Sequence, residues 1–377
     1  MKLVVPNYFK KFKCIADKCK DCCCIGWEID VDEKTAEYYK SLNTSFGKEI
    51  CNNIAFGETN HFILNTKNRC HFLNNKNLCN VILNIGEENL CKICAEHPRY
   101  YEWFDNKKEG GIGICCEEAC RIILSQTKPF YVEEKEINFE GSDEYNSTIY
   151  DILHYARKQI INLLNNTSYQ LSFKLKTILQ YTQELQNLIN DDLLDDAKKL
   201  RFNDFMLQPT NHNIINHFSS SIDTTYYSND LKEILQFYTN LEILDEKWLK
   251  FLKDSITVYN EYPAKITNFK QAHLEIDQYL NNLAIYFIWR YFLKGCFDEE
   301  IISKISFMIS SIAIIEYLYF FIWHTNKNIT FAECMLIAKQ YSKEIEYSDS
   351  NMSELLDSYY FNNEFKIEKL LEICNLI

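Results

Sequence analysis

Hydrophobic residues recur at three- and four-residue spacing through most of the chain from about residue 147 onward. The pattern is clearest at residues 150–166, 173–189 and 231–256. This spacing places apolar side chains along one face of a helix, so each stretch is predicted to be an amphipathic helix that packs against a core. Clusters of asparagine and aspartate separate the stretches. The pattern therefore predicts a mainly α-helical domain over residues 147–377.

Two further stretches are apolar on all sides, Tyr279–Cys296 and Ile305–His324. A membrane helix needs about 20 mostly apolar residues with few charges. The first stretch contains Arg290 and the second has Glu316 at its centre. The amphipathic stretches around them supply packing partners, so we expect a central helix pair of a soluble bundle and no membrane insertion.

Composition supports the helical interpretation and excludes one class of function. Only 9 glycines and 5 prolines occur in 377 residues, which is few for a sandwich or barrel with many tight turns. The net charge is −13, whereas nucleic-acid binding requires clustered cations. The acidity lies in the helical part and suits a lysine-bearing partner.

Cysteines divide the chain into unequal parts. Thirteen of the sixteen precede residue 121. We therefore predict a cysteine-rich metal-binding or iron–sulfur region at residues 1–125, an acidic connection with one strand at 126–146, and the helical domain at 147–377. The cysteines of the first region are Cys14, Cys19, Cys22, Cys23, Cys24, Cys51, Cys70, Cys79, Cys91, Cys94, Cys115, Cys116 and Cys120.

Three explanations compete for this crowding. Disulfides need an oxidising compartment, but the start MKLVVPNYFKKFKC has no apolar stretch of signal-peptide length. Inert core thiols account well for Cys296, Cys334 and Cys374, but poorly for a crowd at one end. A metal or iron–sulfur site in a reduced cytoplasm is the best explanation.

Spacing alone leaves the metal open. Cys19-x2-Cys22 and Cys91-x2-Cys94 are spaced like the two halves of a zinc site. Four thiolates around a [4Fe–4S] cluster fit the same supply of cysteines. No glycine-rich cofactor loop follows a strand, and we expect Gly111-Ile112-Gly113 to be a backbone accommodation near the metal.

Four N-terminal segments resemble the flagellin lysine-N-methylase family, the FliB type. The family pattern runs F-x-C-x4-C-x3-C-C-x-G-W, then C-x-F-L with L-C, then C-x2-Y-P-R, then C-P-E-x2-R. The matching positions are Cys14, Cys19, Cys23, Cys24, Gly26 and Trp27; Cys70, Phe72, Leu73, Leu78 and Cys79; Cys94, Pro98 and Arg99; and Cys116, Glu118 and Arg121.

The chain departs from the pattern at two N-terminal positions, with His97 where tyrosine is usual and Glu117 in place of proline. Two later segments resemble the family more weakly. YLNNLAIYFIWRYFL looks like an N-Y-x-aromatic helix. YSKEIEYSDSN is similar to an F-S-R-x2-E-H element, with Lys343 and Tyr347 in place of arginine and histidine.

The resemblance implies methyl transfer from S-adenosylmethionine to lysine side chains of flagellin, in the cytoplasm, by an enzyme with a [4Fe–4S] cluster. It assigns no catalytic residue. Arg99 and Arg121 could pair with a cofactor carboxylate and Trp27 could stack on the cofactor, although ordinary salt bridges and core packing explain them too. The expected metal ligands are Cys19, Cys23, Cys94 and Cys116, followed by Cys14, Cys24, Cys70 and Cys79.

Two other functions compete with methyl transfer. A non-catalytic redox sensor would use the crowded thiolates, bound to zinc or to an iron–sulfur cluster, as an oxidation switch. An interaction protein would use zinc as a structural element and bind a partner through its helical part.

Overall fold

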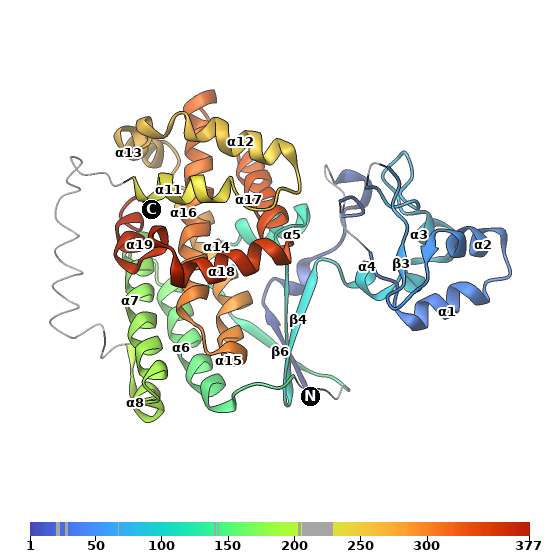
Figure 1. The fold of residues 1–377 in the computed structure, drawn as a ribbon, viewed down its shortest axis with the longest axis horizontal. Helices are drawn as coiled ribbons and strands as arrows, with labels where there is room; N and C mark the ends of the chain where they lie inside the picture. Colours follow the sequence, from blue (N-terminus) through green and yellow to red (C-terminus); the bar gives the residue numbers. More distant parts are fainter. Residues whose placement is uncertain are drawn as a thin grey trace.

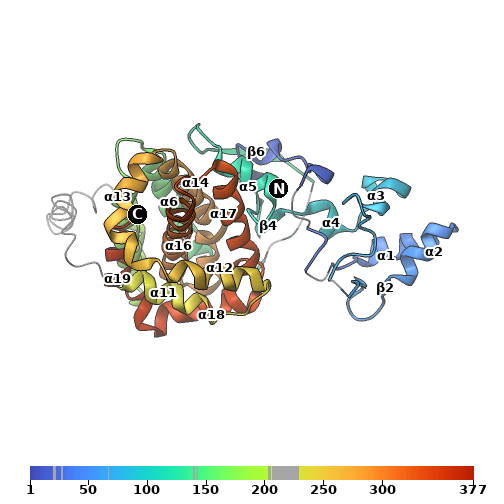
Figure 2. The ribbon, with the colours of Figure 1, turned by 90° about the horizontal axis from the view of Figure 1, so that it is seen from above.

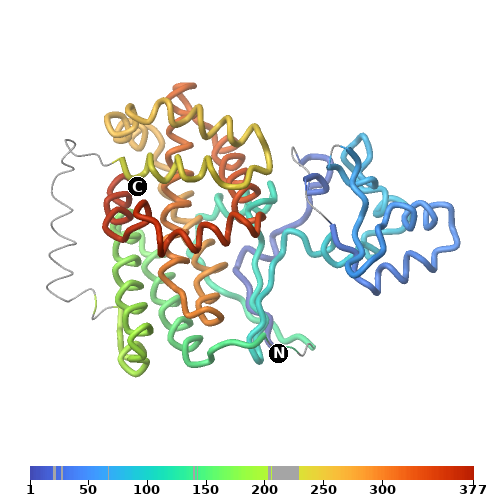
Figure 3. The backbone as a smooth tube through the Cα atoms, viewed as in Figure 1, coloured from blue at the N-terminus to red at the C-terminus, as the bar shows by residue number. Residues whose placement is uncertain are grey.

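The computed structural model describes residues 1–19, 23–26, 29–66, 68–138, 141, 143–202, 205 and 229–377. The chain forms a large helical lobe and a small lobe that projects from one side of it (Figures 1 and 2). The backbone tube enters the small lobe after the first strand and leaves it through helix α4 toward strand β4 (Figure 3). Mainly helical structure is therefore confirmed, and the two lobes meet through a narrow neck.

Helix α16 (Ile302–Asn326) runs through the middle of the large lobe, with α14 (Ile276–Tyr291) packed beside it (Figure 1). In the described part of the chain, α16 alone is long and apolar enough to span a membrane, and 89% of its most apolar window is buried inside the protein. Helices α7, α17 and α18 also pack on α16. The two stretches that are apolar on all sides therefore form a central pair. The described part of this lobe also contains α6 (Ser147–Asn165), α7 (Leu171–Asn190), α8 (Leu194–Lys199), α11 (Asp230–Tyr238), α12 (Glu246–Ile256), α13 (Tyr262–Ala272), α15 (Gly295–Asp298), α17 (Phe331–Ile345), α18 (Asp349–Phe361) and α19 (Ile367–Ile373).

The stretch at residues 231–256 is two helices, α11 and α12, and not one. The turn between them is held by side chains from helices distant in sequence. Asn351 accepts a hydrogen bond from the Glu242 amide at 2.8 Å, and Glu344 accepts one from the Leu244 amide at 3.1 Å. These acceptors satisfy backbone groups that a continuous helix would have paired internally, so tertiary contacts override the local pattern.

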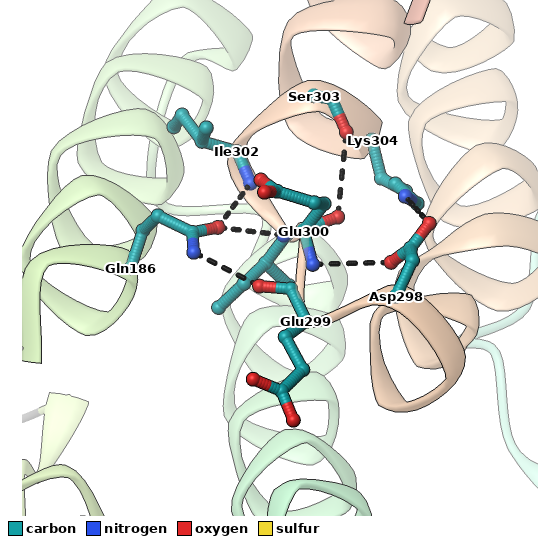
Figure 4. A network of polar contacts seen from close by, with 8 residues as sticks. Gln186, Asp298, Glu299, Glu300, Ile302, Ser303 and Lys304 are labelled. Atoms are coloured by element: carbon teal, nitrogen blue, oxygen red, sulfur yellow. Dashed lines mark hydrogen bonds and ion pairs between the residues drawn. The ribbon is translucent and has the colours of Figure 1, made fainter. Parts of the chain in front are cut away.

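The start of α16 is fixed by a side chain from α7 (Figure 4). Gln186 Oε1 accepts hydrogen bonds from the amides of Ile301 at 2.7 Å and Ile302 at 3.1 Å, and its amide group donates to the Glu299 carbonyl at 2.9 Å. Asp298 accepts from the Glu300 amide at 3.0 Å. Because the first amides of a helix have no partners within it, this cap ties the central helix to its neighbour.

A four-stranded sheet, ordered β4-β5-β1-β6, lies where the large lobe meets the neck. Strand β1 pairs in parallel with β5 and antiparallel with β6, and β4 and β5 form an antiparallel pair. Sequence analysis expected only the strand in the connection, which is β6. The strands are β1 (Lys2–Pro6), β4 (Arg99–Phe104), β5 (Lys107–Ile112) and β6 (Val132–Glu136), and helix α5 (Glu117–Leu124) follows β5.

The small lobe has a hydrophobic core of its own, from Ile29 to Cys94. Residues Val4–Phe12 and Phe104–Leu124, which also fall in the predicted 1–125 region, contribute instead to the core of the large lobe. The predicted domain limits stay a prediction. The small-lobe elements are α1 (Glu33–Ser41), α2 (Ser45–Asn52), β2 (Ile54–Ala55), β3 (His61–Phe62), α3 (Asn80–Ile85) and α4 (Lys92–Glu96).

Candidate functional site

A buried ion pair lies at the junction of α14 with the end of α17. Arg290 Nη1 is 3.2 Å from Glu346 Oε2, and the two side chains are 12% and 0% exposed. Tyr286 and Tyr291 donate hydrogen bonds to the same carboxylate oxygen at 2.8 and 2.6 Å. Charges this deeply buried require such partners, because their desolvation is costly.

Four tyrosine rings surround the Arg290 guanidinium. Its central carbon lies 4.7 Å from the ring centre of Tyr100, 5.2 Å from Tyr291, 5.5 Å from Tyr347 and 5.9 Å from Tyr286. Aromatic faces attract cations at these distances. We call Arg290, Glu346 and these four tyrosines the tyrosine cage.

Two buried polar atoms of the cage have no hydrogen-bond partner among the described residues. They are Glu346 Oε1 and the Tyr100 hydroxyl. An unsatisfied buried group costs about 1–3 kcal/mol. Such groups in a native fold point to a bound ligand, an ordered water or a catalytic role.

Tyr347 forms the outer wall of the cage and is 39% exposed. Its hydroxyl forms a hydrogen bond with the Cys115 thiol, whose pKa is raised to about 12 by burial. A Cβ on Gly113 would lie 2.8 Å from the Tyr347 hydroxyl and 3.2 Å from Arg290 Nη1. Gly111 also lets the backbone approach the cage, because a Cβ there would overlap the Tyr100 hydroxyl. That these glycines lie near a metal stays a prediction.

A small cavity borders the cage. It lies behind Tyr100 and Arg290 and measures about 10 Å³, which is room for one water molecule at most. Its far wall contains Arg157 and Glu109, a second buried ion pair. Tyr347 is the most exposed residue of the cage, so the natural entrance for a larger ligand lies beside it.

One group of thiols lies in the small lobe. Cys70 and Cys91 belong to its core, and Cys79 and Cys94 pack against it. A hydrogen bond from the Cys94 thiol lowers the pKa of Cys91. The pKa of Cys94 is raised by the same hydrogen bond, by burial, and by the charges of Cys91, Cys70 and Cys79. We call these four residues the small-lobe thiols.

The small-lobe thiols supply four soft donors in an apolar setting, which in kind and number suit zinc or an iron–sulfur cluster. Across the described residues, no three histidine, cysteine or acidic side chains are already arranged as ligands of one metal ion. Cys91 is not among the ligands that the family resemblance implied, although its C-x2-C spacing to Cys94 was a usable signal.

A second group of thiols lies at the neck, where α5 begins. The Cys19 thiol donates to Glu117 Oε2 at 3.6 Å. Burial raises the pKa of Cys116, and the charge of Cys14 adds to the increase. Of the expected ligands, Cys19 and Cys116 thus lie by α5 and Cys94 among the small-lobe thiols.

Among the other expected ligands, Cys14 is exposed and Cys70 is buried. Cys23 is exposed and Cys24 half-buried, and the Cys24 carbonyl accepts a hydrogen bond from the Cys70 amide at 2.8 Å. This contact brings the first cysteine segment against the second. Trp27 lies outside the described residues.

The two candidate arginines differ in their surroundings. Arg121 donates two hydrogen bonds to Glu118, at 2.6 and 2.7 Å, which is a salt bridge within α5. Arg99 stands over the rings of Phe12 at 5.0 Å and Phe9 at 5.8 Å. Within the described residues no carboxylate pairs with Arg99.

Comparison with known proteins places the cage in a family. The model of the FliB lysine N-methylase C-terminal domain matches residues 157–373. The chain belongs to this family. A lysine-N-methylase of Salmonella typhimurium is 23% identical over 207 residues, which are 52% of this chain and 51% of that protein. The flagellar biosynthetic protein FliU of Salmonella muenchen is 25% identical over 140 residues, 35% of this chain and 82% of that protein.

The chain spans about half the length of the lysine-N-methylases it matches, and no solved structure matches it. The FliB domain supplies Arg290, Glu346 and three of the four cage tyrosines, whereas Tyr100 and both thiol groups lie before it. The resemblance to the FliB type is thus confirmed for the C-terminal part.

Sequence analysis missed Arg290 and Glu346 as site residues. Two signals were available. Arg290 is a charge inside the apolar stretch 279–296, and Glu346-Tyr347 occupies the last two positions of the F-S-R-x2-E-H element that the later segment resembles. Neither signal shows that the two segments meet.

Proposed function

We propose that this protein is a lysine N-methylase that transfers a methyl group from S-adenosylmethionine to lysine side chains of flagellin in the cytoplasm. The family match over residues 157–373 carries the proposal, because the buried cage falls largely within it. The names of the relatives, lysine-N-methylase and flagellar biosynthetic protein, support both the reaction and the kind of substrate.

The reaction needs a neutral amine. A free lysine has a pKa of about 10.4, so its ammonium must lose a proton before the nitrogen can attack. The nitrogen lone pair then forms a bond to the methyl carbon while the bond from carbon to the sulfonium sulfur breaks and its electrons stay on sulfur. A buried site next to a carboxylate favours this sequence, since it desolvates the amine and accepts its proton.

Arg99 is the residue that fits the carboxylate end of S-adenosylmethionine. It lies at the start of β4, directly before Tyr100 of the cage. Its guanidinium has two aromatic contacts and, within the described residues, no carboxylate partner. A planar fork of N–H donors matches a carboxylate in a bidentate manner.

The small-lobe thiols are the residues that fit the metal group, for which we propose a [4Fe–4S] cluster, with zinc as the alternative. The four thiols share one core and interact with one another. Bound there, the metal group would add charge to the small lobe, together with either redox capacity or structural support for its limited hydrophobic core. We therefore place the ligands at Cys70, Cys79, Cys91 and Cys94.

The test is an assay with flagellin and S-adenosylmethionine carrying a labelled methyl group. Protein purified without oxygen should label flagellin lysines, and mass spectrometry should find one methylene increment for each methyl added. Metal and sulfide analysis of the same preparation should find about four irons and four sulfides per chain. Fully loaded protein that labels no flagellin lysine would refute the methylase, and the redox sensor would then be the better account.

A further inference from the structure

We propose that the tyrosine cage is the binding site of the substrate lysine, with Glu346 Oε1 as the acceptor of the ammonium proton and Tyr347 as the gate. This inference rests on the proposed function and assigns the methyl acceptor to particular atoms. It makes Glu346 the catalytic base and Tyr100 a ligand of the substrate nitrogen.

The chemistry of the unpartnered atoms selects the ligand. An ionised carboxylate only accepts hydrogen bonds, so Glu346 Oε1 calls for a donor, and its partner oxygen is already used by Arg290 and two tyrosines. A lysine ammonium has three donors and is compact enough to lie among aromatic rings. The Tyr100 hydroxyl, also unpartnered, can accept a second of these donors.

The exposed side of the cage is the side on which such a ligand would enter. The small cavity of about 10 Å³ that borders the cage holds no more than one water. On the outer side, Tyr347 is 39% exposed and is held by its contact with Cys115. Rotation of this one side chain would open the cage to a long, unbranched side chain such as lysine.

A side chain that can carry a proton lies beside Tyr347. The His97 ring contacts the Tyr347 ring edge to face, with centres 6.4 Å apart. The contact places an imidazole beside the phenol on the exposed side of the cage.

The step balances with these groups alone. The ammonium gives one proton to Glu346 Oε1, the neutral nitrogen takes the methyl group, and the sulfonium becomes a thioether. The methylated nitrogen is again a cation, and Glu346 returns its proton to solvent past Tyr347 and His97. No oxidant or reductant enters.

The tyrosines and thiols around Glu346 do not titrate in the range where lysine activation matters. Burial raises the pKa of every tyrosine and thiol that faces it, and Arg290 stays charged. These groups are Tyr100, Tyr286, Tyr291, Tyr347, Cys115 and Cys120.

The experiment compares Glu346→Gln with Glu344→Gln as a matched control. Glu344 is a buried glutamate two residues earlier that accepts hydrogen bonds from the amides of Leu244 and Asp245. We measure kcat/KM for flagellin from about pH 6 to about pH 10, together with binding of S-adenosylmethionine. Loss of a general base lowers the rate by roughly 10²- to 10⁴-fold.

We expect E346Q to show that loss near neutral pH and to regain rate toward pH 10, where lysine loses its proton without help. Its affinity for S-adenosylmethionine should match the wild type, and E344Q should follow the wild-type pH profile. An E346Q rate that stays within threefold of wild type across the range would overturn the inference, as would a loss that is the same at every pH.

A second variant keeps the inference testable if E346Q folds poorly. Tyr100→Phe removes a hydroxyl without a partner, so it should leave thermal stability unchanged or slightly higher while raising KM for flagellin at least fivefold. An unchanged KM would contradict the cage as the lysine site. If the wild-type protein transfers no methyl group, the proposed function is wrong. That outcome is distinct from a failure of the cage inference, which requires an active wild type and an unaffected variant.

Discussion

At the residue scale, the pair of Arg157 and Glu109 shows how the cage is held in place. Two hydrogen bonds of 2.7 Å join the side chains, which are 4% and 7% exposed. Arg157 also lies over the Trp289 ring at 4.3 Å, and Trp289 donates to the Gly110 carbonyl at 3.0 Å. Helices α6 and α14 are thereby fixed to strand β5, which carries Gly111 and leads directly into Gly113, the two glycines that face the cage.

Arg157→Met should destabilise the protein by about 3–5 kcal/mol, because it leaves the Glu109 charge buried and unpaired. The double variant R157M/E109L should recover most of that loss, since an apolar pair of similar size has no charge to desolvate. Urea unfolding followed by circular dichroism measures both. A single variant within 1 kcal/mol of the wild type would show that water reaches Glu109.

At the scale of an element, α16 carries one carboxylate through an apolar core. Glu316 is fully buried, and Lys270 lies 3.2 Å away as its charged neighbour. Burial raises the pKa of Glu316 to about 7, and Lys270 opposes part of that increase. The central helix is therefore most stable when this carboxyl group is protonated.

The sign of the resulting pH dependence follows from proton binding. Between about pH 4.5 and about pH 7 the folded state holds the Glu316 proton and the unfolded state does not, so the free energy of unfolding falls as pH rises. Glu316→Gln should remove this slope and stabilise the protein at pH 8 by up to about 3 kcal/mol. Urea midpoints at pH 5 and pH 8 measure it, and parallel slopes for the two proteins would contradict the assignment.

The elements also show what the sequence could predict. Local spacing located α6 and α7 because a helix buries one face within a short stretch. It could not predict the break near Leu244, which depends on Glu344, or the sheet, in which Lys2 pairs with both Lys107 and Glu136. These contacts join segments about 100 or more residues apart, and no local pattern records them.

The same limit applies to the site. Cysteine counts located a thiol-rich region, but cysteines close in sequence, such as Cys19 and Cys24, have different neighbours in space. The cage joins strand β4, helix α14 and the end of α17. Its members were visible one by one in the sequence, and only the fold brings them together.

At the scale of the whole molecule, the two lobes differ in how they are stabilised. The large lobe buries long apolar helices, whereas the small lobe has short helices around a limited core that includes cysteines. Domains of about 60 residues bury too little surface to be robust, and metals often compensate. A metal group on the small-lobe thiols would therefore stabilise that lobe and leave the large lobe nearly unaffected.

Cys94→Ser tests this division against Cys296→Ala, which removes a thiol of the large core that is 1% exposed. C94S should lose most of the bound metal, and trypsin should then cut the small lobe at exposed lysines such as Lys34 and Lys40 while the large lobe survives. C296A should keep the metal and the wild-type cleavage pattern. Equal metal content in the two variants would contradict the assignment of the ligands to the small-lobe thiols. It would favour the thiols at the neck, which are Cys14, Cys19 and Cys116. Loss of metal from C116S in the same analysis would then assign the site to the neck.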